Sequence, residues 1–296
     1  MPEEPVVPPQ DLDPDPDPDL DLDLVLYEVD EDGVATVTLN RPERKNAWSL
    51  PMERRFFALL DEAAHDPAVR VVIVTAAGRA FCPGMDVQRL EQNAQPGQSL
   101  NLQARVPMYS RRDMPKPMIA AVNGACAGIG LVQALICDIR FAARGARFTT
   151  AFTRRGLAGE YNLPYVLPRV IGLENALDLL LSGRVFDADE AKDLGLVSRV
   201  VEPEDLLDTA RAYARDIARN CSPRAMAVVR HQVYGDLDRT FTDALARSYS
   251  AMEFFAGSPD FREGVASFVE KREPKFEGLP PDFDPDEATR DAFLPY

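Results

Sequence analysis

Two glycine-bearing loops are the segments of this sequence best suited to hold a developing negative charge. Gly84 precedes Met85 in one loop, and Gly128 and Gly130 flank Ile129 in the other. Each loop joins a strand-like segment to a helical one, and the first turn of a helix leaves backbone N–H groups without partners. Neighbouring glycines let a ligand approach such a backbone closely. Facing each other, the loops would form an oxyanion hole; otherwise the glycines serve only tight turns.

Other chemistries are less well supported by the residues present. Gly128-Ile129-Gly130 lacks the third glycine of a dinucleotide-binding fingerprint and comes too late in the chain for one. His65 lies in a polar helix end and His231 in an amphipathic helix, so neither favours a catalytic triad. The four cysteines are Cys82, Cys126, Cys137 and Cys221. They match no zinc spacing, so we predict free thiols, three of them in apolar contexts, and no metal site.

The charge balance bears on the choice of partner. The chain has 33 Lys and Arg against 48 Asp and Glu, a net charge of −15. This argues against nucleic acid or an anionic membrane surface as the main partner. No apolar run reaches the ~18 residues of a membrane span, and the acidic N-terminus has no targeting signal. We therefore expect a cytoplasmic protein that gathers cations locally if its ligand is an anion.

The elements that must position the loops alternate between strands and helices, which predicts an α/β fold. Strands are expected over 25–29, 34–39, 69–75, 118–122 and 138–142, and helices over 51–64, 131–135, 175–182, 187–194, 203–219, 222–235, 238–256 and 259–272. A further helix is expected after Asp86, which is predicted to be its N-cap, and the polar segment 87–113 is expected to be mobile.

Three regions are predicted along the chain. Residues 1–24 alternate Asp with Pro and Leu, a low-complexity pattern that favours a disordered acidic arm. Residues 25–200 are expected to form an α/β core, and residues 201–296 a helical C-terminal region.

Seven segments, in order and in register, resemble the enoyl-CoA hydratase/isomerase, or crotonase, superfamily. They are RPERKNAWS (41–49), GRAFCPGMD (78–86), KPMIAAVNGACAGIGL (116–131), CDIRFAA (137–143), LPRVIG (167–172), SGRVFDADEAKDLGLVSRVV (182–201) and FVEKREPKF (268–276). The resemblance covers about residues 25–276. It implies a crotonase-type spiral of ββα units followed by a helical C-terminal trimerisation region, with trimers often paired into hexamers.

The resemblance also implies roles for the two glycine loops. The first oxyanion donor would be the backbone N–H of Met85 and the second that of Ile129, which stands where relatives usually have glycine. A backbone donor tolerates a different side chain, although Ile129 is expected to narrow the pocket near the thioester. The loop residues implied to bind the substrate are Phe81, Gly84, Asp86, Gly128 and Gly130.

The expected acid and base positions depart from those of the family's hydratases. Val132 and Phe152 stand where the resemblance places two glutamates, and neither side chain can transfer a proton. Glu160, in GLAGEY (156–161), resembles the single catalytic acid of several 3,2-enoyl-CoA isomerases, which shuttles a proton between C2 and C4. Burial near Phe152, Leu157 and Val132 would raise the pKa of Glu160. The alternative is a surface carboxylate or helix cap.

The cations that a coenzyme A ester requires are found in two segments. The resemblance implies that Arg41, Lys45 and Ala47, in the first loop, contact the nucleotide part of coenzyme A. Phe268 and Lys271 match a C-terminal pair that often reaches the ligand of a neighbouring subunit. No cofactor is implied besides coenzyme A as part of the thioester substrate.

Several functions remain open at this stage. Enoyl-CoA isomerisation fits a single carboxylate best, and hydration by a one-acid variant is the nearest alternative. The superfamily also contains lyases, dehalogenases and C–C hydrolases. A non-catalytic acyl-CoA-binding homologue, or an assembly protein using only a trimer or hexamer surface, are readings of a different class.

Overall fold

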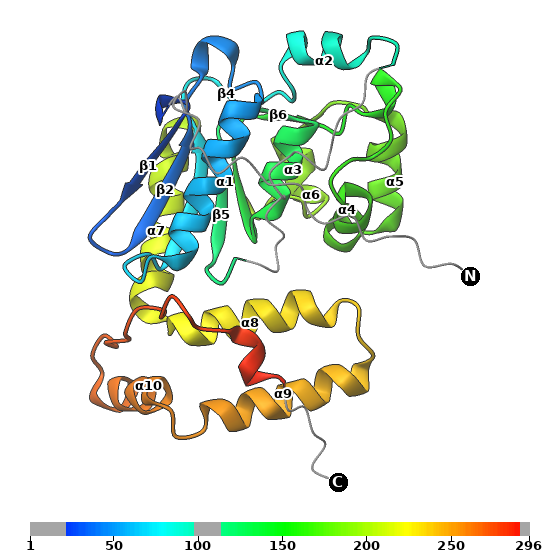
Figure 1. The fold of residues 1–296 in the computed structure, drawn as a ribbon. Helices are drawn as coiled ribbons and strands as arrows, with labels where there is room; N and C mark the ends of the chain where they lie inside the picture. The colour runs from blue at the N-terminus through cyan, green and yellow to red at the C-terminus, as the bar shows by residue number, and fades with distance from the viewer. Residues whose placement is uncertain (1–21, 98–113, 291–296) are drawn as a thin grey trace.

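A computed structural model describes residues 22–97 and 114–290. Its larger sheet has six strands in the order β1-β2-β3-β5-β7-β10 (Figure 1). β1 and β2 form an antiparallel hairpin, and the other neighbours are parallel. The strands are β1 (Val25–Val29), β2 (Val34–Leu39), β3 (Val71–Ala76), β5 (Met118–Val122), β7 (Ile139–Ala143) and β10 (Arg199–Val201). All five sequence-predicted strands are therefore confirmed to within two residues, and β10 is additional.

A second, four-stranded sheet has the order β4-β6-β8-β9. Its strands are β4 (Ala80–Cys82), β6 (Ala125–Ala127), β8 (Arg147–Thr149) and β9 (Phe186–Asp187). β4 and β6 are parallel, with Cys82 opposite Cys126. Strands this short leave no alternation of polar and apolar residues to read, and the sequence did not predict them.

The helices are α1 (Leu50–His65), α2 (Val87–Asn93), α3 (Ile129–Ile136), α4 (Leu163–Ile171), α5 (Leu173–Ser182), α6 (Ala188–Asp193), α7 (Leu206–Asn220), α8 (Pro223–Asp236), α9 (Phe241–Phe255) and α10 (Pro259–Glu270). Several begin at a serine whose hydroxyl accepts a hydrogen bond from the third residue after it, as at Ser49, Ser222 and Ser258. A proline follows each serine within two residues, where its missing N–H costs nothing.

The larger sheet is covered by helices on both faces. Val72 and Val74 of β3 pack into the main core with α1 and α3, whereas Val71 and Ile73 pack against α7. Both faces of β3 are thus buried, which explains its continuous apolar sequence. α7 is also tied to the β1–β2 hairpin by ion pairs. They are Arg211–Glu28, Arg215–Asp30 and Arg219–Asp32.

α8, α9 and α10 lie in a separate layer beyond one end of the larger sheet (Figure 1). A small cluster there contains Val228, Ala251 and Ala288, with Phe255 and Phe283 packed against it. The predicted α/β class is confirmed, while the predicted boundaries at residues 24 and 200 stay predictions.

Several expectations need adjustment. α4 was not predicted, because Pro164 and Pro168 obscure its helical pattern. The predicted arm over 1–24 lies outside the described residues except for Leu22–Leu24, a 3-10 turn whose Leu24 packs on the core. The segment expected to be mobile begins with α2, capped by Asp86 as predicted, and its part 98–113 lies outside the described residues. In the described ranges, no helix has the length and apolar character to cross a bilayer.

Candidate active site

The backbone of the first glycine loop is oriented by a single bridge to Trp48. The Trp48 N–H donates to the Gly84 carbonyl at 2.8 Å, and the Asp86 N–H donates to the Trp48 carbonyl at 3.1 Å. In this parallel bridge Met85 lies opposite Trp48, so its own N–H points to the other side. Gly84 has φ +113°, a conformation that favours glycine. The sequence therefore presents the Met85 N–H away from the segment that supports it.

The second loop ends at the first turn of α3. Gly128 has φ 52° and anchors the loop by donating its N–H to the Thr149 carbonyl at 3.1 Å. Ile129 is the first residue of α3, so its N–H has no carbonyl one turn earlier in the helix to pair with. Positive potential at a helix N-terminus adds to the attraction of such an N–H for an anion.

The backbones of the two loops lie close together. A Cβ placed on Gly84 would lie 3.4 Å from the Ala127 carbonyl oxygen of the second loop. A Cβ on Gly130 would lie 2.1 Å from the Cys82 carbonyl oxygen of the first loop, closer than atoms can approach. The first turn of α3 therefore packs directly on the end of β4, and only glycine fits at residue 130.

Apolar side chains stand beside these loops at the two positions where the sequence resemblance implied acids. Val132 and Phe152 are 3% and 5% exposed, and Phe81 is fully buried. The Phe152 ring lies beside the second loop, 3.9 Å from where a Cβ of Gly128 would be. Any proton transfer near the loops must therefore use another side chain.

Glu160 lies on a compact turn just before α4. A Cβ on Gly159 would meet the Pro164 ring at 2.4 Å, and the Glu160 carbonyl accepts from the Leu163 N–H at 2.9 Å. Tyr161 has φ 49°, unusual for a residue with a side chain, as does the next residue. Such conformations persist only where the surroundings enforce them.

The exposure of this segment differs in part from what was expected. The Glu160 side chain is half-buried. Leu157, expected to contribute to its apolar surroundings, is 39% exposed and does not provide that burial.

Two cationic residues of the first loop differ in their surroundings: Arg41 is paired within the protein, and Lys45 is exposed. Arg41 donates to the Asp86 carboxylate at 2.8 Å and to the Ala47 carbonyl at 3.5 Å. Burial acts to raise the pKa of Asp86, but hydrogen bonds from Arg41 and from the Gln88 N–H bring it below its ordinary value. Lys45 is exposed and left-handed, with φ 56°. Arg41 thus braces the loop, while Lys45 faces solvent.

Asn46 is the loop residue that sequence reasoning missed. It is fully buried, and its amide donates to the Ala77 and Ala80 carbonyls at 2.8 and 2.7 Å. Its side-chain oxygen accepts from the Arg41 N–H at 2.7 Å. A buried asparagine whose side-chain nitrogen and oxygen are both paired fixes the first loop to β4. No sequence pattern indicated this role, because the charges of Arg44 and Lys45 just before it favoured a ligand-binding interpretation of the loop.

Phe268 and Lys271 are not brought to the glycine loops within one chain. Phe268 is 84% exposed at the end of α10, and Lys271 caps that helix with φ 53°. Figure 1 places α10 in the C-terminal layer, away from α3 and β4. A role at the loops would require a neighbouring subunit, as the sequence resemblance implied.

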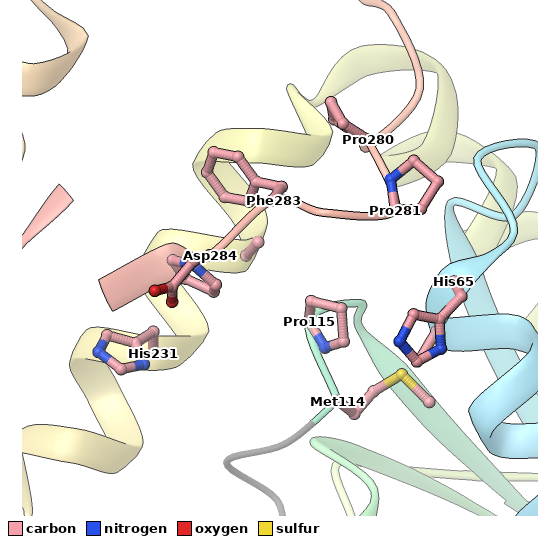
Figure 2. Close-up of a pocket in the computed structure, with 11 residues that line it drawn as sticks. His65, Met114, Pro115, His231, Pro280, Pro281, Phe283 and Asp284 are labelled. Carbon is pink, nitrogen blue, oxygen red and sulfur yellow. The ribbon is translucent and has the colours of Figure 1, made fainter. Parts of the chain in front are cut away.

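Three of the four cysteines are buried, as predicted from their apolar contexts. Cys82, Cys126 and Cys137 are buried free thiols, and burial raises the pKa of Cys82 to about 12. His65 and His231 line a cavity of about 270 Å³ between the core and the C-terminal layer (Figure 2). Within residues 22–97 and 114–290, no group of three His, Cys, Asp or Glu is arranged to hold a metal ion.

Comparison with known proteins shows which family the chain is similar to. Residues 30–279 match the family model described as enoyl-CoA hydratase/isomerase. The chain is 36% identical over 255 residues to the 1,2-epoxyphenylacetyl-CoA isomerase of Escherichia coli, covering 84% of this chain and 96% of that one. It is 36% identical over 264 residues to the probable enoyl-CoA hydratase EchA12 of Mycobacterium tuberculosis, covering 85% and 92%. The crystal structure of an enoyl-CoA hydratase from Bacillus anthracis superposes with a TM-score of 0.79 at 28% identity, covering 86% and 100%.

Proposed function

The chain belongs to the enoyl-CoA hydratase/isomerase family, and on that basis we propose that it binds an acyl-CoA thioester and stabilises its enolate. The donors in this proposal are the backbone N–H groups of Met85 and Ile129. Two aligned donors of this kind are each worth about 3 kcal/mol of transition-state stabilisation. The observation that carries the proposal is the contact between the loops, at Gly84 with Ala127 and at Gly130 with Cys82.

Glu160 is the proton-transfer group in this proposal. The apolar Val132 and Phe152 argue against hydration by two glutamates, so a single carboxylate would have to remove and return a proton. That is the requirement of double-bond isomerisation. The 36% identical relative named 1,2-epoxyphenylacetyl-CoA isomerase supports an isomerase in the broad sense only, since the substrate in its name is an epoxide. The turn that holds Glu160 supports the assignment, because its left-handed residues fix the direction of the backbone at that point.

Hydration by one acid is the second candidate, supported by the names of relatives such as the hydratase of Mycobacterium tuberculosis. It differs from isomerisation in needing a water molecule held beside the double bond. A lyase or hydrolase, or an acyl-CoA-binding homologue without turnover, completes the alternatives. In each case coenzyme A enters as part of the substrate, and no further cofactor is proposed.

Subunit association is part of the same proposal. Phe268 and Val269 are 84% and 71% exposed, and Phe261 and Val265 on the same helix are also exposed. An apolar helix surface of this kind favours burial against another copy of the chain. In a homotrimer, or a hexamer of two trimers, Phe268 and Lys271 of one subunit would reach the ligand of the next.

Replacement of Glu160 by Gln tests the proton-transfer role. We expect Glu160→Gln to lower kcat on 3-enoyl-CoA and 2-enoyl-CoA substrates by about 10²-fold or more, because the amide cannot accept the proton. Proton NMR in deuterium oxide measures the step directly, as loss of deuterium incorporation at C2. Glu174→Gln, at an exposed position in the first turn of α5, is the matched control.

The outcomes separate the candidates. Unchanged turnover of every accepted thioester by Glu160→Gln would exclude Glu160 as the proton carrier. Product analysis of the unsubstituted enzyme distinguishes a shifted double bond from an added hydroxyl group. Acyl-CoA binding in calorimetry without any turnover would indicate the non-catalytic homologue.

A further inference from the structure

The last described segment of the chain, residues 280–290, continues beyond the family match, which ends at residue 279. We call it the strap. It is nevertheless packed rather than solvated, since Ala288 and Thr289 are each 1% exposed. This segment lies outside the family match and yet buries side chains, so its contacts need an account of their own.

The residues that lead into the strap are fixed to the α/β core. A Cβ on Gly278 would lie 2.3 Å from the Pro67 carbonyl oxygen, just after α1. Arg70, beside β3, donates to the Phe276 carbonyl at 2.6 Å, and Leu279 is 2% exposed. The strap therefore begins at a point held by the core.

The far end of the strap is fixed to the C-terminal helices. Ala288 packs with Val228 of α8 and Ala251 of α9, and Phe283 packs against the same cluster. The strap supplies two members of this small core, which is separate from the cores of the larger sheet. Removing it would leave α8 and α9 with much less apolar surface buried between them.

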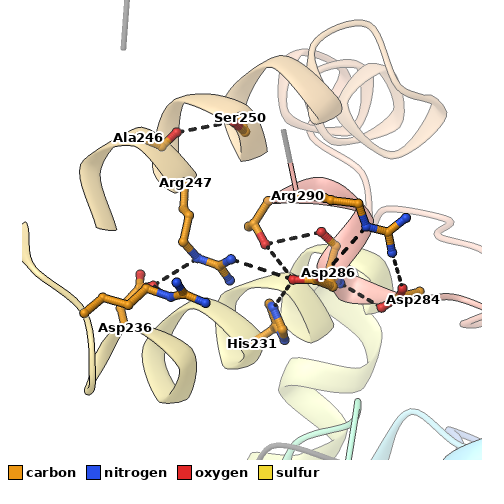
Figure 3. Close-up of polar contacts among 10 residues, drawn as sticks. His231, Asp236, Ala246, Arg247, Ser250, Asp284, Asp286 and Arg290 are labelled. Atoms are coloured by element: carbon orange, nitrogen blue, oxygen red, sulfur yellow. Dashed lines mark hydrogen bonds and ion pairs between the residues drawn. The ribbon is translucent and has the colours of Figure 1, made fainter. Parts of the chain in front are cut away.

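Asp286 is the polar centre of this attachment (Figure 3). Its carboxylate lies 3.1 Å from His231 of α8, 3.7 Å from Arg247 of α9 and 3.8 Å from Arg290. Arg247 is 5% exposed and also donates to Asp236 at 3.1 Å. Asp286 thus joins α8 and α9, with Arg247 as its buried partner and with its own side chain 45% exposed.

Between its two ends the strap lines one side of a cavity (Figure 2), and Phe283 on this stretch also packs on the small cluster. His65, Met114 and Pro115 line the cavity from the core, and Pro280 and Pro281 line it from the strap. The strap is therefore attached through its two ends and through Phe283.

We propose that the strap is an intramolecular fastening, anchored at Asp286, that holds α9 on α8 and attaches this pair to the α/β core, in addition to the direct ion pair between Arg230 of α8 and Asp138. By doing so it sets where α10, which follows α9, presents its exposed end. The proposal does not rest on the enzymatic activity, because every contact that carries it lies outside the glycine loops.

Hydrogen–deuterium exchange of the full chain tests this fastening. Asp286→Ala removes the carboxylate shared by His231 and Arg247, and Ala288→Asp places a charge in the small cluster. We expect each to accelerate amide exchange in α8 and α9 at least tenfold while β3 and β5 keep their protection. Asp282→Ala, at an exposed position in the same strap, is the matched control and should match the unsubstituted chain.

Two results would overturn the proposal. In one, neither Asp286→Ala nor Ala288→Asp changes exchange in α8 and α9. In the other, exchange in β3 and β5 accelerates equally, so that the strap contributes only to global stability. This test reads amide exchange in α8 and α9, whereas the Glu160 test reads deuterium incorporation at C2, so the two proposals can fail independently.

Discussion

Gln133 is fully buried on α3, one turn beyond Ile129, and neither its amide nitrogen nor its oxygen has a hydrogen-bond partner within the described residues. A buried, unsatisfied polar atom costs about 1–3 kcal/mol. A residue of this kind reduces stability unless something else pairs with it, and it lies in the helix that provides a proposed oxyanion donor.

We expect Gln133→Leu to raise the free energy of unfolding by about 1–3 kcal/mol, because leucine has a similar volume and no polar atoms to satisfy. Urea denaturation followed by circular dichroism measures the change. Gln92→Leu, at an exposed position on α2, should alter stability by less than about 0.5 kcal/mol. A destabilised Gln133→Leu variant would indicate that a buried water pairs with the amide.

At the scale of elements, the position of α3 relative to β4 depends on Gly130. We expect Gly130→Ala to destabilise the fold by about 1–3 kcal/mol, because the new methyl group would push the first turn of α3 away from Cys82. The Ile129 N–H would move with that turn, away from the first loop, so we also expect kcat to fall by at least about 10-fold. Thermal unfolding and steady-state kinetics report the two effects. Gly264→Ala in α10, where the nearest atom is 3.8 Å away, should instead leave activity unchanged.

Lys116 connects α1 to the start of β5. It is 2% exposed, and its ammonium group donates to the Ala63 and Asp66 carbonyls at 2.6 and 2.5 Å, at the C-terminal end of α1. Burial lowers the pKa of Lys116 from 10.5 to about 8, against the smaller opposing influence of Asp66. Below pH 8 the lysine is charged in both states, whereas between pH 8 and 10.5 the unfolded chain binds more protons.

The stability of the unsubstituted chain should therefore rise with pH across that interval. Relative to Lys116→Met, we expect a gain of about 1–3 kcal/mol between pH 7.5 and 10.5. Denaturant unfolding of both proteins at the two pH values gives the difference. A difference that stays constant with pH would mean that the hydrogen bonds to Ala63 and Asp66 keep the lysine charged throughout.

Gly130 belongs to a local sequence pattern, whereas the contacts of Lys116 join elements distant in the sequence, and this difference decides what could be predicted. The glycine loops and the strands of the larger sheet are local patterns, so their positions were predictable. Asn46 and Lys116 were not, because their partners lie on elements distant in the sequence. Gln133 was not, because its side chain has no partner within the described residues and no spacing pattern marks it. The two-residue and three-residue strands of the smaller sheet were not predictable either, because each pairs with a strand distant in the sequence.

At the scale of the whole molecule, the exposed end of α10 points to assembly. We expect the unsubstituted chain to sediment at three or six times the mass of one chain, and Phe268→Asp to dissociate at micromolar concentration, since it places a charge in an apolar contact. Analytical ultracentrifugation measures both. Leu26→Asp, on an exposed position of β1, is the control, and a monomeric unsubstituted chain would contradict the proposed trimer.

The ion pairs between α7 and the β1–β2 hairpin bear on how fast an anionic ligand reaches the protein. Arg211, Arg215 and Arg219 are neutralised by carboxylates of the hairpin, so they add little to the electric field beyond the surface. With a net charge of −15, the long-range potential is repulsive to a polyanion such as a coenzyme A ester. Encounter with such a ligand then becomes faster as dissolved ions shorten the Debye length to about 8 Å, the reverse of electrostatic steering.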